Sequence, residues 1–195
     1  MNTTTEHYNL NVLNHGISYD SVGYRPEECI GQYTHLKSQL RIQPGQSVLD
    51  VGCGLGFGYA LLTECVYTGL DAAEMMVNGA RLLYGPDSSY ATFEHVHFND
   101  VDTVDLSQDY VLFSGTFNTE SPWPVIASTV RKAWKVARVG VGVAYQYVTP
   151  EEPVGSFTIY PHSKWLKLFQ SLSAHYAYDS SWSKLNATMT ARRHP

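Results

Sequence analysis

The sequence predicts an α/β fold, in which a mostly parallel sheet carries helices on both faces and ends in an antiparallel hairpin. Apolar runs of strand length alternate with stretches of helical period along most of the chain, and this alternation is typical of a parallel sheet. The last two segments instead alternate apolar and polar residues and are separated by a polar turn, which is typical of a hairpin. With 195 residues, the chain is long enough to bury a sizeable core.

Five predicted strands form the parallel part of the sheet. Each is rich in Val, Leu, Phe or Tyr, as is typical of strands that are buried on both faces. They cover residues 47–51, 66–70, 92–97, 110–114 and 139–147. Two further strands, residues 173–178 and 184–191, form the hairpin, so the sequence predicts a seven-stranded sheet.

Helical patterns fill the intervals between the strands. They cover residues 57–65, 73–84, 123–136 and 163–170, with a short turn near 103–106. In residues 123–136, apolar side chains recur at the three- and four-residue spacing of an amphipathic helix. Helices of this kind between parallel strands pack on both faces of the sheet.

Composition and charge disfavour several functions. The formal net charge is −5 and no run of Lys and Arg exceeds two residues, so nonspecific nucleic-acid binding is not expected. The 3 cysteines form no CxxC pair, which favours reduced thiols in a cytoplasmic protein and disfavours a structural zinc site, whereas assistance by another metal stays open. The N-terminal segment is polar and no apolar run approaches about eighteen residues, so neither a signal peptide nor a membrane span is expected.

A glycine-rich stretch, SVLDVGCGLGFGYALL at residues 47–62, links the first strand to the next segment. A dinucleotide fingerprint needs glycine at its first, third and sixth positions, yet the sixth position is Phe57 when counted from Gly52 and Tyr59 when counted from Gly54. A nucleoside-triphosphate loop needs a Gly-Lys pair, and this stretch contains no lysine. The glycines therefore indicate a tight turn and a closely approaching ligand that is not a pyrophosphate.

Polar side chains follow the next two strands at the same edge of the sheet. Asp71 comes about twenty residues after the glycines, the spacing at which a carboxylate binds the two hydroxyls of a ribose. Asp71 is also suited to capping the helix that follows it, and both interpretations stay open. Asn99 and Asp100 follow the third strand, at the edge where open α/β sheets bind ligands.

These motifs resemble those of class I S-adenosylmethionine-dependent methyltransferases, which have a Rossmann-like fold; VLDVGCGLG resembles the first motif of that family. In the family, this loop wraps the methionine part of the cofactor, the second-strand acid binds the ribose, the third-strand acid reaches the adenine, and the fourth strand opens the methyl-transfer site. The resemblance implies cofactor-binding roles for Tyr24, Asp50, Gly52, Cys53, Gly54, Gly56, Asp71, Ala72, Asn99, Asp100, Val101, Ser114 and Gly115.

The chemistry of this cofactor agrees with the resemblance. S-adenosylmethionine is a sulfonium cation that carries a carboxylate and an amine but no phosphate, so a mildly acidic pocket without a pyrophosphate fingerprint suits it. Its methyl group is already activated, so the protein mainly aligns the acceptor atom, the methyl group and the sulfur. The expected product of the cofactor is S-adenosylhomocysteine.

The flanking segments LNHGISYDSVGYRPEECIGQYTHL, DYVLFSGTFN and VRKAWKVARVGVGVAYQYVTP resemble small bacterial or phage methyltransferases. In that subgroup the leading segment covers the cofactor. We therefore expect one methyltransferase domain, with residues 1–40 covering the active site and residues 41–195 forming the cofactor-binding core. Tyr24 and Gln32 are candidates for lining the cofactor, and His15 is a candidate catalytic residue near the substrate. A packing role remains an equal alternative for Tyr24 and for His15 taken singly.

The segment SGTFN, residues 114–118, disfavours the standard base methyltransferases. Adenine-N6 enzymes carry a proline pair here, and cytosine-C5 enzymes need a cysteine beyond this strand; the segment has no proline and all three cysteines precede it. Asn118 is a candidate for orienting the acceptor, and Glu120 is either a base or a first-turn helix charge. Tyr145 is either a catalytic aromatic at the rim of the site or a core residue.

Together these observations predict methyl transfer from S-adenosylmethionine to an oxygen or nitrogen atom of a small molecule or an exposed side chain. Two other function classes remain open. One is a regulatory or sensor protein that binds S-adenosylmethionine without turnover, because no residue is an unambiguous base. The other is a nicotinamide oxidoreductase on the same fold, which the glycine spacing disfavours.

Overall fold

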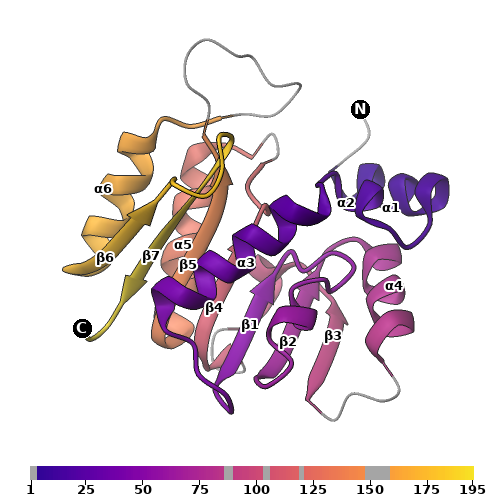
Figure 1. Cartoon of the computed structure of the whole chain (residues 1–195), viewed down its shortest axis with the longest axis horizontal. Helices are drawn as coiled ribbons and strands as arrows, with labels where there is room; N and C mark the ends of the chain where they lie inside the picture. The colour runs from indigo at the N-terminus through magenta and orange to yellow at the C-terminus, as the bar shows by residue number, and fades with distance from the viewer. Residues whose placement is uncertain (1–3, 86–89, 103–105, 119–120, 148–158) are drawn as a thin grey trace.

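The computed structural model describes residues 4–85, 90–102, 106–118, 121–147 and 159–195. Its centre is a seven-stranded sheet with the order β3-β2-β1-β4-β5-β7-β6 (Figure 1). Neighbouring strands from β3 to β5 are parallel, whereas β7 is antiparallel to both β5 and β6. The strands are β1 Ser47–Val51, β2 Val66–Asp71, β3 Ala91–His95, β4 Gln108–Ser114, β5 Ala137–Gln146, β6 His175–Asp179 and β7 Asn186–Arg192. The predicted α/β class, the seven strands and the closing hairpin are confirmed.

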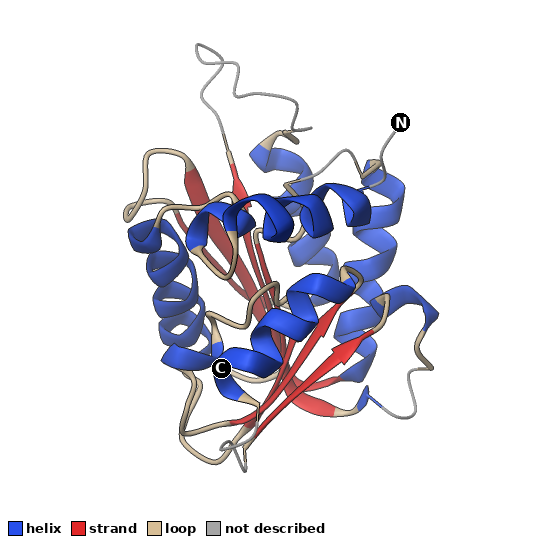
Figure 2. Cartoon of the chain, turned by 90° about the vertical axis from the view of Figure 1, so that its right-hand side faces the viewer, coloured by secondary structure: helices blue, strands red, loops and turns tan. Residues whose placement is uncertain are grey.

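Helices cover both faces of the sheet (Figure 2). The α-helices are α1 Thr4–His15, α2 Tyr19–Val22, α3 Pro26–Leu40, α4 Glu74–Tyr84, α5 Trp123–Val136 and α6 His162–Leu172. Two 3₁₀ turns, η1 Tyr59–Leu61 and η2 Phe98–Asp100, follow β1 and β3. Among the described residues, no helix is long and apolar enough to cross a membrane.

The alternation of side chains along β4 builds two cores, one on each face. Val111 and Phe113 pack in a cluster with α5 and α6, whereas Tyr110 and Leu112 pack in a cluster with α3 and α4. This follows from the period of two of a β-strand, in which successive side chains point to opposite faces. A strand without polar residues at these four positions is stable only in the middle of such a sheet.

One predicted helix is wrong. Residues 57–65 form turns and the single 3₁₀ turn η1 instead of an α-helix. Gly56 has a φ of +75°, in the left-handed region that interrupts a right-handed helix. Gly58 lies directly beneath the Tyr33 ring, where an added Cβ would come within 2.4 Å, so the packing of α3 fixes this segment in a tight turn.

Other boundaries differ by a few residues. β3 ends at His95 instead of residue 97, because the chain turns there into η2. α4 begins at Glu74 with Ala73 as its N-cap, while Oδ1 of Asp71 accepts a hydrogen bond from the Ala73 amide at 2.8 Å and closes the turn just before the helix. The predicted turn at 103–106 falls largely outside the described residues.

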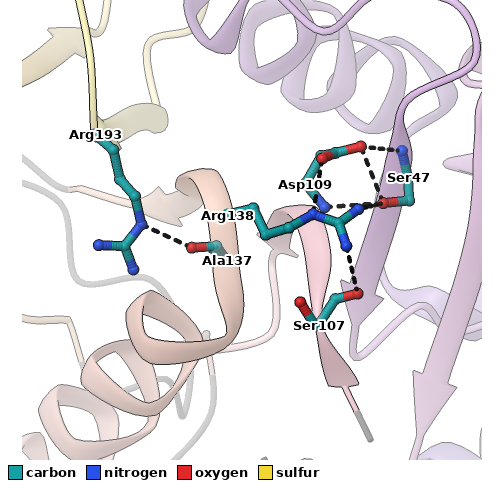
Figure 3. A network of polar contacts seen from close by, with 6 residues as sticks. All are labelled: Ser47, Ser107, Asp109, Ala137, Arg138 and Arg193. Carbon is teal, nitrogen blue, oxygen red and sulfur yellow. Dashed lines mark hydrogen bonds and ion pairs between the residues drawn. The ribbon is translucent and has the colours of Figure 1, made fainter. Parts of the chain in front are cut away.

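A polar network fixes the amino-terminal edge of the sheet (Figure 3). Oδ2 of Asp109 accepts from the Ser47 amide at 2.8 Å and from its hydroxyl at 3.1 Å, and Oδ1 accepts from Nε of Arg138 at 3.1 Å. Burial raises the pKa of Asp109, but these hydrogen bonds outweigh it and hold the pKa below its usual range. The network joins the starts of β1, β4 and β5, at the edge opposite to the glycine-rich loop.

Candidate active site

A pocket of about 300 Å³ opens at the carboxyl ends of β1, β2 and β4. Its walls come from these strand ends, from the loops that follow them, from η2, and from one side of α5. α1, α2 and the first turns of α3 complete the lining, and Figure 1 shows α1 and α2 above the tips of β2 and β3. This is the edge at which parallel sheets with helices on both faces bind ligands.

The glycine-rich loop forms the floor of the pocket. Gly52 and Gly54 have φ values of +73° and +54°, which glycine adopts without steric cost. Leu70 O accepts hydrogen bonds from the amides of Gly52 at 2.7 Å and Cys53 at 3.1 Å, which ties the loop to β2. An added Cβ on Gly52 would meet Thr116 at 2.7 Å, so this loop and the one after β4 lie in close contact.

Gly56 does not line the pocket. Its φ is +75°, and an added Cβ would meet the Phe93 ring at 2.7 Å, so it packs the loop against β3 and α4. Gly56 thus packs behind Gly52, Cys53 and Gly54, which all line the pocket, and its predicted role in cofactor binding stays a prediction.

Asp71, the last residue of β2, and Ala72, which follows it, lie in the pocket wall. Oδ2 of Asp71 accepts from the Gly54 amide at 2.9 Å and Oδ1 accepts from the Ala73 amide at 2.8 Å. A carboxylate has about four acceptor positions, so two hydroxyl groups of a ligand can still donate to it. Burial raises the pKa of Asp71, and the hydrogen bonds from Ala73 and Gly54 oppose this rise.

The third strand brings Asn99, but not Asp100 or Val101, to the pocket. The Asn99 side chain exchanges two hydrogen bonds with Oγ1 of Thr129, at 3.0 and 3.1 Å, and Asp100 is exposed. Phe98 lines the pocket beside Asn99 and is only 4% exposed. Sequence reasoning missed Phe98 because the strand was predicted to run through residue 97.

Lys132 holds η2 in place from α5. Its Nζ donates to the backbone carbonyls of Phe98 at 2.6 Å, Asn99 at 3.0 Å and Val101 at 2.6 Å. It also lies 4.9 Å from the centre of the Phe98 ring. Because an ammonium group has three N–H donors, this one side chain satisfies three carbonyls at the turn that forms a pocket wall.

The loop after β4 forms the opposite wall. Ser114 and Gly115 line the pocket, and Gly115 has a φ of +72° with the Tyr24 hydroxyl where a Cβ would lie, at 2.6 Å. Tyr24 also lines the pocket, and its hydroxyl accepts a hydrogen bond from Nδ2 of Asn118. Oδ1 of Asn118 accepts from the Gln146 amide at 3.0 Å, so Asn118 lies behind Tyr24 and positions it.

Residues 48–140 match a family model described as a methyltransferase domain, a span that runs from β1 into β5 and includes the loops that form the pocket. Residues 48–140 therefore form a methyltransferase domain. The methyltransferase uses S-adenosylmethionine, as the glycine motif and the strand-end acid predicted. Its predicted place among small bacterial or phage enzymes stays a prediction.

Several solved structures share the fold of this methyltransferase. Magnesium protoporphyrin IX methyltransferase from Synechocystis PCC 6803, with bound S-adenosylmethionine, is 16% identical with a TM-score of 0.64, over 84% of this chain and 80% of that chain. A methyltransferase from Aquifex aeolicus is 14% identical with a TM-score of 0.66, over 86% and 93% of the two chains. A chain from the complex between the Haloferax volcanii Trm112 methyltransferase activator and a methyltransferase is 15% identical with a TM-score of 0.72, over 98% of both chains. None of the curated protein sequences compared with the chain matches it.

The charge of the pocket fits the cofactor of the methyltransferase. Among the described residues that line it, Asp71 is the sole carboxylate and there is no Lys or Arg. Such a lining suits a ligand with a positive sulfur and no phosphate. Among the described residues, no group of three or more His, Cys, Asp or Glu is placed to hold a metal ion.

Asp50 lies beneath the pocket and not in its lining. It is fully buried, and its Oδ2 accepts hydrogen bonds from the hydroxyls of Tyr33 at 2.7 Å and Tyr67 at 2.5 Å. Burial raises the pKa of Asp50 to about 6, and the two tyrosine hydroxyls oppose the rise. Tyr33 also lines the pocket, so Asp50 anchors a pocket residue of α3 to the start of the glycine-rich loop.

Two of the three predicted catalytic residues lie away from the pocket, and the third lies behind its lining. His15 is exposed at the end of α1 and does not line the pocket. Tyr145 is 1% exposed and stacks on Trp165 at 4.5 Å between ring centres, with its hydroxyl 2.9 Å from Nδ1 of His162. Tyr145 therefore occupies a core position, which was one of its two interpretations. Asn118 lies behind the lining and contacts Tyr24, which lines the pocket. Glu120 lies outside the described residues.

Sequence reasoning missed the contribution of α1. Thr4, Thr5 and Tyr8 line the pocket, and Oδ1 of Asn9 accepts from the Met75 amide at 3.0 Å, which docks α1 on the start of α4. α1 has weak amphipathic character, with one buried residue, Val12. Its position depends on contacts with a distant helix, so no local pattern could have predicted it.

Proposed function

We propose that this methyltransferase transfers the methyl group of S-adenosylmethionine to an oxygen or nitrogen atom of a small molecule or of an exposed side chain. The observation that carries the proposal is the pocket of about 300 Å³ at the strand ends, whose lining brings the glycine-rich loop, Asp71, and Ser114 with Gly115 together at one edge of the sheet. The absence of a proline in SGTFN supports an acceptor other than adenine-N6.

In this proposal, different residues of the pocket bind different parts of the cofactor. Asp71 accepts from the ribose hydroxyls, Asn99 and Phe98 contact the adenine, and the loop from Gly52 to Gly54 surrounds the amino-acid part. The strand-end positions of these residues and the resemblance of their motifs to the family support the assignment.

Residues 1–40 are proposed to cover the site. Their support is the contribution of α1, α2 and α3 to the lining, through residues such as Tyr8, Tyr24 and Gln32. By excluding water and fixing the acceptor beside Gly115, this cover aligns the reacting atoms, which is the main requirement of the reaction.

S-adenosylmethionine, held by the glycine-rich loop, Asp71 and Asn99, would supply a methyl group already activated by its positive sulfur, with S-adenosylhomocysteine as the leaving group and the acceptor proton released to solvent. In this proposal the protein holds the acceptor beside Gly115, in line with the bond between the methyl carbon and the sulfur. Burial raises the pKa of the Tyr24 hydroxyl and of the Cys53 thiol, so both keep their protons and neither competes as a nucleophile.

A turnover experiment tests the proposal. The purified protein is incubated with S-adenosylmethionine labelled in the methyl group and with separate low-mass and protein fractions of a cell extract, and the release of S-adenosylhomocysteine is measured. Label in an oxygen- or nitrogen-linked methyl group of the low-mass or protein fraction supports it, and Asp71→Ala, at a cofactor concentration below saturation, is the control with reduced label. Cofactor binding without release of S-adenosylhomocysteine from any fraction would instead indicate the sensor function.

A further inference from the structure

The two outer strands of the sheet differ in how their free sides are covered. At β3, the Phe93 carbonyl accepts hydrogen bonds from Nε and Nη2 of Arg81 at 3.0 and 2.7 Å, so a side chain of α4 shields this edge. At the opposite edge, β6 is the outermost strand (Figure 1), and all of its residues except the last are exposed. A sheet edge with free backbone groups is a template for a further strand.

The backbone groups of Tyr176 and Tyr178 point outward from the edge at β6. The amide of Arg193, which follows β7, donates to Val139 O of β5 at 2.8 Å. Because backbone groups alternate in direction along a strand, the even-numbered residues of β7 face β6, and they pair there with the odd-numbered residues of β6. The N–H and C=O groups of the two tyrosines are therefore left on the free side. Within the described part of the chain, nothing hydrogen-bonds them.

Both ends of β6 are fixed in place. The Ser173 hydroxyl donates to Arg192 O at 2.5 Å and accepts from the His175 amide at 3.0 Å. At the other end, Oδ2 of Asp179 lies 3.0 Å from Nδ1 of His35 on α3. The strand is therefore already ordered before it meets a partner, which lowers the entropy cost of pairing.

The sequence of β6 is self-complementary about Ala177. When a second copy of β6 pairs antiparallel with this residue at the centre, Tyr176 lies opposite the second copy's Tyr178. In the same register, His175 lies opposite the second copy's Asp179. The outward backbone groups of the tyrosines then face each other as hydrogen-bonded pairs. Aromatic pairs and pairs of opposite charge between neighbouring strands both stabilise a sheet.

Asp179 can accept a further hydrogen bond. Its Oδ1 accepts from the amide and the hydroxyl of Ser181 at 2.8 and 2.7 Å, and its Oδ2 is paired with His35. A carboxylate has about four acceptor positions, so one is left for the imidazole N–H of an opposing His175. The hydrogen bonds from Ser181 and His35 hold the pKa of Asp179 below its usual range, so it is a carboxylate at neutral pH.

We propose that β6 pairs antiparallel with β6 of a second copy of this chain, centred on Ala177, so that the two sheets join in a symmetric dimer. A two-fold axis makes each cross-strand contact occur twice. No residue of β6 lines the pocket, so the inference is independent of the proposed function. A contact between two strands of 5 residues is small compared with the interfaces of permanent dimers, so we expect a dimer that dissociates on dilution.

Sedimentation equilibrium of the full chain from about 1 µM to about 1 mM tests the proposal. Ala177→Lys places two ammonium groups against each other at the centre, and His175→Asp places a carboxylate opposite Asp179. We expect both to weaken the dimer by at least about tenfold. His175→Lys keeps the opposite charges and should dimerise at least as tightly as the wild type. Ala60→Lys, on the exposed surface of η1, is the matched control.

The proposal is overturned if the wild type stays a monomer over the whole range, forms a larger oligomer, or forms a dimer that Ala177→Lys leaves intact. Equal weakening by His175→Asp and His175→Lys would overturn the register. Hydrogen exchange at high and low concentration checks the backbone pairing: the amides of Tyr176 and Tyr178 should exchange more slowly in the dimer, and unchanged exchange would contradict it. Thermal unfolding shows whether each variant is folded, and the two His175 variants decide if Ala177→Lys is not.

Discussion

Asp71 is the residue on which the cofactor assignment depends most. We expect Asp71→Ala to weaken binding of S-adenosylhomocysteine by about 1 to 3 kcal/mol, because the acceptor of the ribose hydroxyls is lost. Calorimetric titration measures the change, and Glu74→Ala, on the exposed first turn of α4, is the control. Equal affinities of wild type and Asp71→Ala would mean that Asp71 only closes the turn before α4.

A substitution at Gly115 tests how closely the Tyr24 side chain packs against the loop after β4. Gly115→Ala has to place a Cβ 2.6 Å from the Tyr24 hydroxyl, whereas Gly45→Ala, at a similar φ of +79°, meets nothing within 4 Å. Both lose roughly 1 kcal/mol through the left-handed backbone, and Gly115→Ala is expected to lose roughly 1 to 3 kcal/mol more through overpacking. Urea unfolding measures both, and equal losses would contradict the contact with Tyr24.

Asp50 makes stability depend on pH. Its pKa is about 6 in the folded protein against an ordinary value of 3.8, so the folded state binds the proton more tightly than the unfolded state. The contribution to stability is complete below pH 3.8 and is lost as the pH rises through about 6. The free energy of unfolding of the wild type should fall relative to that of Asp50→Asn by up to about 3 kcal/mol across this range. Parallel pH profiles in urea unfolding would contradict a buried, titrating Asp50.

Among the elements, η2 depends on a side chain of another helix. Lys132→Met removes three hydrogen bonds to the carbonyls of η2, and we expect it to weaken binding of 5′-methylthioadenosine by roughly 1 to 3 kcal/mol. Lys135→Met, on the exposed side of the last turn of α5, is the control and should bind normally. Calorimetry that finds the same affinity for both variants would show that η2 keeps its shape without the ammonium group.

The elements that the sequence predicted well have strong local patterns. α5 begins and ends at the predicted residues because its apolar stripe covers its whole length, and β1 is a short apolar run ended by glycine. The helix predicted over residues 57–65 is absent because the left-handed backbone of Gly56 and the packing of Gly58 under the Tyr33 ring override the helical spacing of the apolar residues. That fit depends on α3, which lies more than fifteen residues earlier in the chain, so the local pattern could not reveal it.

The site shows the same division between local and distant information. Five of the predicted residues lie at the carboxyl ends of parallel strands or within three residues beyond them, and all five line the pocket: Gly52, Gly54, Asp71, Ser114 and Gly115. The rule that open α/β sheets bind ligands at this edge therefore located them from the sequence. The contributions of α1, η2 and α5, which include Tyr8, Phe98 and Thr129, arise from tertiary packing and were not predicted. Tyr145 lies away from the pocket because successive side chains of a strand point to opposite faces, and its ring lies on the face that packs against α6.

At the scale of the whole molecule, the amino-terminal edge of the sheet has a structural role, whereas the carboxyl-terminal edge forms the pocket. The amino-terminal edge is held by the network of Ser47, Asp109 and Arg138, which ties three strands together (Figure 3). The carboxyl-terminal edge carries the glycine-rich loop, Asp71 and the loop after β4, and leaves a pocket between them. This arrangement separates the residues that fix the sheet from those that contact a ligand.

The central claim is that this pocket binds S-adenosylmethionine, and direct calorimetric titration tests it. The purified protein, first checked for co-purified ligand, is titrated with S-adenosylmethionine, S-adenosylhomocysteine and, as the control, NAD. The account predicts that the first two bind with similar affinity and that NAD does not bind, because the pyrophosphate fingerprint is missing and the described lining offers no Lys or Arg. Binding of NAD, or of none of the three by folded and ligand-free protein, would contradict it.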